Sequence, residues 1–292
     1  MRSLLFVPAD DERKIAKAAT TGADALILDL EDSVAPARKD LARRMVADAI
    51  GAADVGGPKL YVRLNPLTSG LVAADLAAIM AAHSSRRLHG VMQPKARSAA
   101  DAVTLCAMIA GHERQLGIAE GSTQLIVLVT ESAAAVQSMS GYDAAAPRLA
   151  GLTWGAEDLS ADIGAAATRD ENGAYSGPYA LARTQTLIAA AAAGTAAIDT
   201  VYPDFRDAEG FARDCAEAVR DGFTAKMAIH PAQVPVINQT FTPTQTEIAS
   251  AQRIVAAFDD ADTGVIALDG RMLDRPHLLR ARRLLARAKI GG

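Results

Sequence analysis

The chain has 292 residues, of which 50% are hydrophobic and 22% are charged, a composition typical of a globular protein with a large core. Its formal net charge of -4 provides no broad basic surface, so nucleic acid is not an expected partner. The apolar run at the N-terminus is too short for a signal peptide, and no stretch approaches the ~18 apolar residues of a membrane span. We therefore expect a cytoplasmic protein without membrane contact.

Short apolar runs alternate with longer, alanine-rich stretches along most of the chain. The runs predict parallel strands that are buried on both faces, and the stretches predict helices. The predicted strands are 3–8, 24–30, 59–65, 88–94, 124–130, 149–155, 197–202 and 223–229. The predicted helices are 11–21, 36–50, 71–83, 99–116, 178–193, 207–221, two within 231–259, and a basic one at 276–289. Eight strand–helix repeats predict an α/β fold, the (β/α)8 or TIM barrel, with a doubly wound open sheet as the alternative.

The pattern changes after the eighth predicted strand. A break at Thr242-Pro243 separates two predicted helices, and residues 264–269 form a short apolar stretch before the last helix. We therefore expect two parts, a barrel catalytic domain at 1–240 and a C-terminal helical extension or lid at 241–292. The extension would dock on its own barrel or on a neighbour's. The two cysteines, Cys106 and Cys215, lie in predicted helices and are expected to be buried or half-buried free thiols.

Polar residues follow almost every predicted strand, and the active site of a TIM barrel lies at those strand ends. We expect one mouth to gather Asp29, Glu31, Asp32, Arg63, Asn65, Lys95, Glu131, Glu157, Asp158, Asp199 and His230. The acids outnumber the cations, and buried charge is costly unless it is paired or bound to metal. Two carboxylates with waters are a magnesium type of site, and Glu131 with Asp158 is the natural pair. The alternative is that each is an acid at the start of the helix that follows it.

Three of these side chains have more than one open interpretation. Arg63 forms a salt bridge to Glu31 or Asp32, or it stabilises an enolate or holds a carboxylate. His230 is a general base or makes a structural hydrogen bond. Lys95 would suit the Schiff base of a class I aldolase, but the neighbouring acids should keep its pKa high, which argues against that role.

Several short motifs occur in an order that resembles a known family. They are 2–8 (RSLLFVP), 29–34 (DLEDSV), 62–65 (VRLN), 94–95 (PK), 131–133 (ESA), 155–158 (GAED) and 229–231 (IHP). From Arg2 to about Ala288 the chain resembles the citrate lyase beta subunit-like proteins. These belong to the HpcH/HpaI aldolase–citrate lyase superfamily, with the malyl-CoA and citramalyl-CoA lyases.

The resemblance implies a role for particular residues. Glu131 and Asp158 become ligands of magnesium, for which manganese is an alternative, and Arg63 together with Glu131 binds substrate. The positions that contact the CoA part or line its pocket are Phe6, Arg13, Lys17, Ile229 and His230. Residues 268–274 resemble a lid whose catalytic aspartate corresponds to Asp274, and which reaches into a neighbouring subunit. That implies a homo-oligomer, commonly a trimer. The alternative is that Asp274 only caps the last helix, since it lies two residues before Pro276.

One departure from the family is visible at Ala9, where a glycine is usual. A methyl group there would narrow the approach of the pantetheine arm of CoA or shift the loop, and it leaves the metal site untouched.

The resemblance also implies a reaction, a reversible, magnesium-dependent retro-Claisen or retro-aldol cleavage of a carbon–carbon bond. The substrate would be a small 3-hydroxyacyl-CoA thioester such as malyl-CoA or citramalyl-CoA, giving a 2-oxo acid and acetyl-CoA. In this scheme Arg63 stabilises the enolate, Asp274 removes the α-proton in the condensing direction, and Glu31 and Asp32 hold Arg63 and metal-bound waters. The alternatives are a malyl-CoA-type thioesterase, a citrate lyase beta subunit that acts on the thioester of a carrier-protein partner, and a non-catalytic acyl-CoA-binding barrel.

Overall fold

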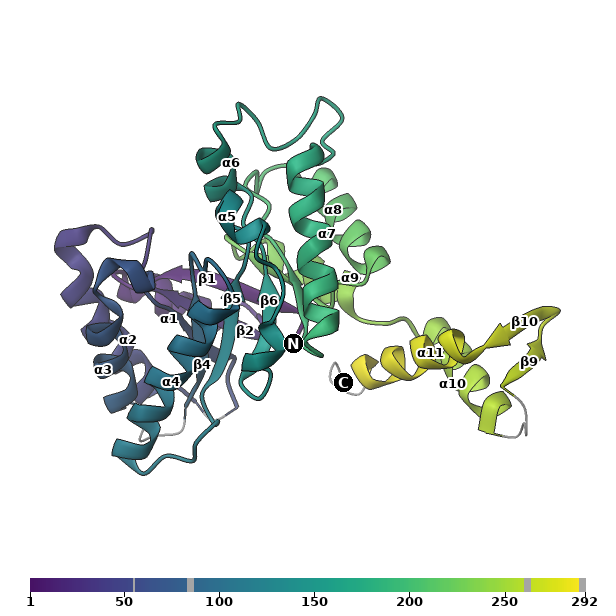
Figure 1. The fold of residues 1–292 in the computed structure, drawn as a ribbon, viewed down its shortest axis with the longest axis horizontal. Coiled ribbons are helices and arrows are strands. Elements are labelled where there is room, and N and C mark those ends of the chain that lie inside the picture. Colours follow the sequence, from purple (N-terminus) through teal and green to yellow (C-terminus); the bar gives the residue numbers. More distant parts are fainter. Residues whose placement is uncertain (55, 83–86, 260–263, 289–292) are drawn as a thin grey trace.

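The computed structural model describes residues 1–54, 56–82, 87–259 and 264–288, and its largest part is a closed parallel barrel (Figure 1). The strands follow one another around the barrel in chain order, and β8 pairs with β1 to close it. They are β1 Ser3–Pro8, β2 Ala25–Asp29, β3 Lys59–Arg63, β4 Leu88–Gln93, β5 Gln124–Leu128, β6 Leu149–Thr153, β7 Ala197–Asp199 and β8 Ala225–Ala228. The predicted (β/α)8 barrel is confirmed, and the open sheet is wrong.

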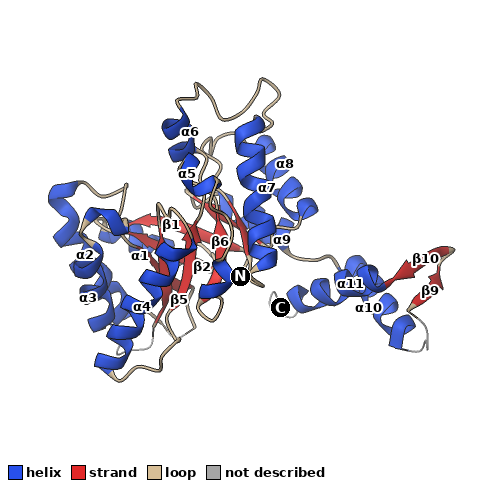
Figure 2. Ribbon diagram, in the orientation of Figure 1, coloured by secondary structure: helices blue, strands red, loops and turns tan. Residues whose placement is uncertain are grey.

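Helices surround the strands and cover the outer face of the barrel (Figure 2). They are α1 Glu12–Ala18, α2 Lys39–Ala52, α3 Val72–Ala82, α4 Ala99–Leu116, α5 Ala133–Val136, α6 Glu157–Ile163, α7 Gly177–Ala192, α8 Ala208–Asp221 and α9 Gln233–Phe241. Short 3-10 turns occur at Pro36–Arg38, Leu67–Ser69 and Tyr142–Ala145. The predicted helices are present, whereas α5 and α6 were not resolved in the sequence pattern. His83, the predicted end of one helix, lies outside the described residues.

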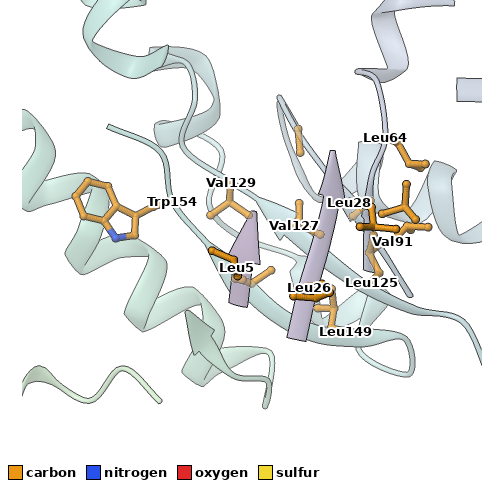
Figure 3. Close-up of a cluster of buried hydrophobic side chains, with 14 of the residues drawn as sticks. Leu5, Leu26, Leu28, Leu64, Val91, Leu125, Val127, Val129, Leu149 and Trp154 are labelled. Carbon is orange, nitrogen blue, oxygen red and sulfur yellow. The ribbon is translucent and has the colours of Figure 1, made fainter. Parts of the chain in front are cut away.

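The core has two layers because successive side chains of a strand point to opposite faces. One layer fills the barrel interior with Leu4, Ala25, Ile27, Tyr61, Met92, Ile126, Leu128, Ile198, Ala225 and Met227. The other layer packs between strands and helices and includes Leu5, Leu26, Val127 and Trp154 (Figure 3). Cys215 is buried in this second layer and Cys106 is half-buried, and both are free thiols, as predicted.

The same alternation decides which polar side chains face the barrel mouth. Asp29 lies two residues after the interior Ile27, and Arg63 lies two residues after the interior Tyr61, so both point inward. Asp199 directly follows the interior Ile198 and therefore points outward, toward the helices. The prediction that Asp199 joins the mouth is wrong.

The C-terminal extension consists of α10 Gln245–Asp259, a hairpin of β9 Val265–Leu268 and β10 Arg271–Asp274, and α11 Arg275–Ala288. Asp269 and Gly270 join the two strands with φ angles of 51° and 73°, the backbone of a two-residue type I′ turn. The predicted short apolar stretch is thus the first strand of a hairpin. The predicted last helix is present as α11, and its expected end at Lys289 lies outside the described residues.

The extension lies at the end of the barrel where the strands begin. A cavity of about 680 Å³ is lined by Ala286 and Arg287 of α11, by Met1, and by Lys59, the first residue of β3. Asp274 precedes the opposite end of α11, about a dozen residues or roughly 18 Å farther along the helix. In Figure 1 the β9–β10 hairpin accordingly stands far from the barrel. The described part of the chain contains no helix long and apolar enough to span a membrane.

Candidate active site

A cavity of about 330 Å³ opens where the barrel strands end. Its polar lining comes from Asp29, Ser33, Arg63, Glu131, Glu157, Asp158 and Thr200. Its apolar lining includes Phe6, Leu128, Trp154, Val201, Met227 and Ile229. The cavity therefore brings together seven residues that the sequence singled out for a site: Phe6, Asp29, Arg63, Glu131, Glu157, Asp158 and Ile229.

Arg63 is held by two buried acids. Its Nε and Nη2 donate to the two carboxylate oxygens of Asp29, both at 2.7 Å, and Nη1 lies 2.8 Å from Glu31 Oε2. The ring of Phe6 lies 4.9 Å from the guanidinium carbon, a cation–π contact. Burial lowers the pKa of Arg63, but the two acids outweigh it and the pKa is raised overall. The guanidinium is therefore charged and fixed in orientation beside the cavity.

The expected partners of Arg63 are only partly those of the structure. Glu31 does contact it, but Asp32 instead lies 3.0 Å from the ammonium of Lys95. Asp29, which the sequence placed at the mouth without a role, is the bidentate partner. It stands opposite Arg63 in the register between β2 and β3. Its spacing of two residues from the apolar Ile27 was a usable signal, because alternate strand residues share a face.

Lys95 lies among the acids of the mouth. Its Nζ is 2.7 Å from Glu31, 3.0 Å from Asp32 and 3.4 Å from Asp158. Burial lowers the pKa of this amine, yet the hydrogen bonds to Glu31 and Asp32 outweigh burial and raise it overall. A charged amine is a poor nucleophile, so the geometry disfavours a Schiff base. The backbone of Lys95 has φ of +50°, a left-handed conformation that is uncommon outside glycine, and its N–H donates to Glu131 Oε2.

Glu131 and Asp158 are the two acids that suit a metal. Glu131 is 6% exposed, and burial, aided by the charges of Asp158 and Glu31, raises its pKa to about 8. Such a carboxyl needs further positive charge nearby to be ionised at neutral pH, and a divalent cation would provide it. Within the described ranges no group of three or more His, Cys, Asp or Glu is arranged to hold a metal. A metal held by Glu131 and Asp158 would therefore need water or substrate oxygens to complete its shell, as magnesium tolerates.

The alternative interpretation was that Glu131 and Asp158 are acids at the start of the helices that follow them. It applies to only one of the two. Ser132, not Glu131, caps α5, since its side chain accepts from the backbone of Ala135. Asp158 does lie in the first turn of α6, so the helix dipole favours its charge there. For Glu131 the capping interpretation is wrong.

The predicted CoA contacts are spread around the rim. Arg13 and Lys17 are exposed on α1, four residues apart and so on one side of the helix. Ile229 lines the cavity and is 42% exposed. His230 does not line the cavity; its ring stacks on Phe205 with centroids 4.6 Å apart.

Asp274 is the one predicted catalytic residue that lies far from this cavity in the same chain (Figure 1). Its carboxylate is 52% exposed and lies 2.6 Å from Nδ1 of His277. The backbone N–H of Asp274 also faces Nδ1, at 3.2 Å, so the pair links the end of β10 to the first turn of α11. The structure therefore does not bring Asp274 together with Arg63, Glu131 and Asp158 in one subunit.

Comparisons with known proteins agree with this fold. Residues 2–231 match the family model HpcH/HpaI aldolase/citrate lyase. Citrate lyase subunit beta of Leuconostoc mesenteroides subsp. cremoris is 34% identical over 97% of this chain and 92% of that protein. A (3S)-malyl-CoA thioesterase of Cereibacter sphaeroides is 33% identical over 99% of this chain and 94% of the relative.

A solved structure is similar over nearly the whole chain. CitE of Mycobacterium tuberculosis, in complex with magnesium, acetoacetate and coenzyme A, superposes with a TM-score of 0.76 at 35% identity. The match covers 99% of this chain and 98% of that one. The matching family model, the curated relatives and the shared barrel lead to one conclusion: the chain belongs to the HpcH/HpaI aldolase/citrate lyase family.

Proposed function

We propose that this protein is a magnesium-dependent carbon–carbon lyase that cleaves a small 3-hydroxyacyl-CoA thioester, such as malyl-CoA or citramalyl-CoA, into a 2-oxo acid and acetyl-CoA. The observation that carries the proposal is the grouping of one fixed guanidinium, Arg63, with two carboxylates, Glu131 and Asp158, around one cavity. The related CitE structure, which holds magnesium, acetoacetate and coenzyme A, supports the pairing of a metal with a CoA compound.

Glu131 and Asp158 would hold the metal ion. Lys95 contacts Asp158 at 3.4 Å, its longest contact, and keeps Glu31 and Asp32 as closer partners. Asp158 is therefore the acid that Lys95 releases at least cost. When bound, magnesium, or manganese in its place, supplies Lewis-acid polarisation of the oxygens of the 2-oxo acid half.

Arg63 stabilises the negative charge that develops on the thioester oxygen during cleavage. Its orientation is set before substrate arrives, because Asp29 holds two of its nitrogens and Glu31 faces the third. Donors that need no rearrangement at the moment of reaction are the effective kind. Glu31 and Asp29 are thus positioning groups, and Asp32 supports the site through Lys95.

The CoA arm would run over the rim formed by Phe6, α1 and Ile229. Arg13 and Lys17 give this rim two exposed cations that suit the phosphates of CoA. Ala9, which replaces the usual glycine, is fully buried in the layer between barrel and helices and does not line the cavity. A fully buried methyl group offers no surface to the arm, which speaks against a narrowed approach.

The remaining group, Asp274, would come from a second copy of the chain. The extension points away from its own mouth, and it leaves Met272 79% exposed and Leu279 45% exposed. Such apolar exposure suits a surface that packs on another subunit. We propose a homo-oligomer, a trimer in the simplest case, in which the part formed by 241–292 crosses to the barrel part, 1–240, of a neighbour.

A thioesterase acting on a malyl-CoA-type substrate is the second candidate, since a relative named (3S)-malyl-CoA thioesterase matches almost the full chain. Incubation with malyl-, methylmalyl-, citramalyl- and citryl-CoA, with and without magnesium, separates the two by product. A lyase releases a 2-oxo acid with a shorter acyl-CoA, for example glyoxylate with acetyl-CoA from malyl-CoA or pyruvate with acetyl-CoA from citramalyl-CoA. A thioesterase releases the free hydroxy acid with CoA.

Two further outcomes of this experiment matter. Cleavage only after a carrier protein is added would favour a carrier-dependent citrate lyase beta subunit. Binding without any turnover would favour an acyl-CoA-binding barrel and overturn the proposal. A cytoplasmic location stays a prediction from the sequence.

A further inference from the structure

A network of buried charges lies on the outer face of the barrel, away from the cavity. Lys226 on β8 is fully buried, and its Nζ lies 2.7 Å from Asp199 Oδ2 and 2.6 Å from Asp214 Oδ2. Arg169 joins the network at Asp214, at 2.6 Å. None of these residues lines the cavity. Buried ion pairs add little stability compared with apolar packing, so their presence here calls for a role other than stability.

The network is bonded to the one tryptophan of the chain. Asp199 Oδ1 accepts from the indole Nε1–H of Trp154 at 2.8 Å. The indole also meets the ring of Tyr175 edge-on, with centroids 4.8 Å apart, and the guanidinium of Arg169 lies 3.6 Å from the centre of that ring. The chain thus leaves the network at Trp154 and returns to it at Arg169 and Tyr175, which contact each other. In the sequence, α6 and the long loop after it connect Trp154 to Tyr175, and in Figure 1 they stand above the barrel.

The segment 155–174 enclosed by these two residues carries Asp158. It also passes very close to the other proposed metal ligand, because a Cβ atom placed on Gly155 would lie 3.1 Å from Cγ of Glu131. The N–H of Gly155 donates to Thr130 Oγ1 at 3.2 Å, next to Glu131 in sequence. The position of Trp154 therefore sets the path of the next four residues relative to Glu131.

We propose that Asp199 and Lys226 are positioning residues for the metal site. By holding Trp154, they fix the segment 155–174 so that Asp158 stays beside Glu131 in an arrangement that binds a divalent cation. They act through the backbone after Trp154 and touch neither metal nor substrate. The inference rests on the proposed metal site and adds residues that the reaction itself does not use.

The test uses variants that remove different contacts of the network. Asp199→Ala removes the acceptor of the indole and a partner of both Lys226 and Arg183, whereas Asp199→Asn keeps an oxygen for the indole. Trp154→Phe removes the donor and leaves all ion pairs in place, so it serves if Asp199→Ala does not fold. The matched control is Glu113→Gln, which breaks another buried pair, Glu113 with Arg148 at 2.5 Å and 2.9 Å, remote from the cavity lining.

Two readouts that need no turnover are measured on the full-length protein. Titration calorimetry gives the Kd of Mg²⁺, and hydrogen exchange of the metal-free protein reports the order of residues 155–174. Asp199→Ala and Trp154→Phe should bind Mg²⁺ roughly 10- to 100-fold more weakly, the usual effect of removing a supporting partner, with faster exchange in 155–174. Asp199→Asn should recover much of the affinity. Glu113→Gln should lower Tm and leave both readouts unchanged.

Unchanged Mg²⁺ affinity and exchange in Asp199→Ala and Trp154→Phe would overturn the inference. An equal loss in Glu113→Gln would also overturn it, because general destabilisation would then account for the effect. Asp158→Asn tests the metal site itself. If this variant binds Mg²⁺ like the wild type, the proposed metal site and this inference are both wrong. If the affinities follow the expected pattern but no carbon–carbon cleavage is found, only the proposed reaction fails.

Discussion

Replacing Arg63 by lysine tests whether the guanidinium contributes chemistry or only neutralises buried acids. Arg63 contacts Asp29 through two nitrogens and Glu31 through a third. Lysine keeps the positive charge but is a point donor that cannot reproduce this planar fork. Arg63→Lys therefore separates charge from geometry at the cavity.

The structure sets the size of both effects. Lysine can keep about one of the three contacts, and each of the two lost charge-assisted hydrogen bonds is worth about 1.5–3 kcal/mol, so a loss of roughly 3–6 kcal/mol in unfolding free energy is expected. If Arg63 also stabilises the developing oxyanion, kcat should fall roughly 10²- to 10³-fold, as on removal of an oxyanion donor. The loss of unfolding free energy follows from contacts that the structure shows. The fall in kcat is expected only if Arg63 also contacts the reacting substrate.

Arg148 provides the matched control. It is a buried arginine that donates through two nitrogens to Glu113, and it does not line the cavity. Arg148→Lys should lose comparable stability and keep its kcat. The assay measures release of 2-oxo acid from the best thioester at saturating Mg²⁺, alongside chemical unfolding. A folded Arg63→Lys with near-normal kcat would show that Arg63 has only a structural role.

Two further predictions concern the proposed metal ligands and the buried acid Glu113. A chelator should abolish turnover and Mg²⁺ or Mn²⁺ should restore it, while Glu131→Gln and Asp158→Asn should lose Mg²⁺ binding in calorimetry. Full activity of either variant in chelator would contradict the metal site. Burial raises the pKa of Glu113, but Arg148 and the N–H groups of Thr123 and Gly121 lower it to about 2. Because the folded pKa is depressed, Glu113 stabilises the protein above pH about 4.5, and this stability is lost as the pH falls toward 2. The fall of Tm over that range should be shallower in Glu113→Gln, and an equally steep fall would count against this assignment.

The barrel could be predicted because eight apolar runs alternate with helical stretches, and their positions agree closely with the strands. Which side chains of those strands point into the barrel was harder to predict. Runs that are apolar on both faces show no alternation, so the sequence pattern does not say which side chains enter the barrel. Asp199 was therefore placed at the mouth although it points outward, and Asp29 was given no role although it holds Arg63.

Short helices and strands were the other features that the sequence analysis did not predict. The helix α5 has four residues, too few for a helical period to show in the sequence. The hairpin β9–β10 did have a signal, since Asp269-Gly270 is a preferred pair for a two-residue turn between short strands. Which acid meets which cation at the mouth depends on the register between β2 and β3, and that register is a property of the folded barrel.

The last prediction concerns Asp274, which the structure leaves outside its own active site. If Asp274 only caps α11, Asp274→Asn should change stability by ~1 kcal/mol or less and leave turnover alone. If it is the general base of a neighbouring site, the variant should fold, bind Mg²⁺ and oligomerise, yet lose roughly 10²- to 10⁴-fold in rate and fail to exchange the α-proton of acetyl-CoA. An active site shared between subunits can be tested more directly by mixing two inactive variants. Mixing Asp274→Asn chains with Glu131→Gln chains should restore activity, because some cavities then pair an intact metal site with an intact extension. Mixed oligomers confirmed by mass that stay as inactive as both parents would exclude the crossing extension, and Asp274 would return to its cap at the start of α11.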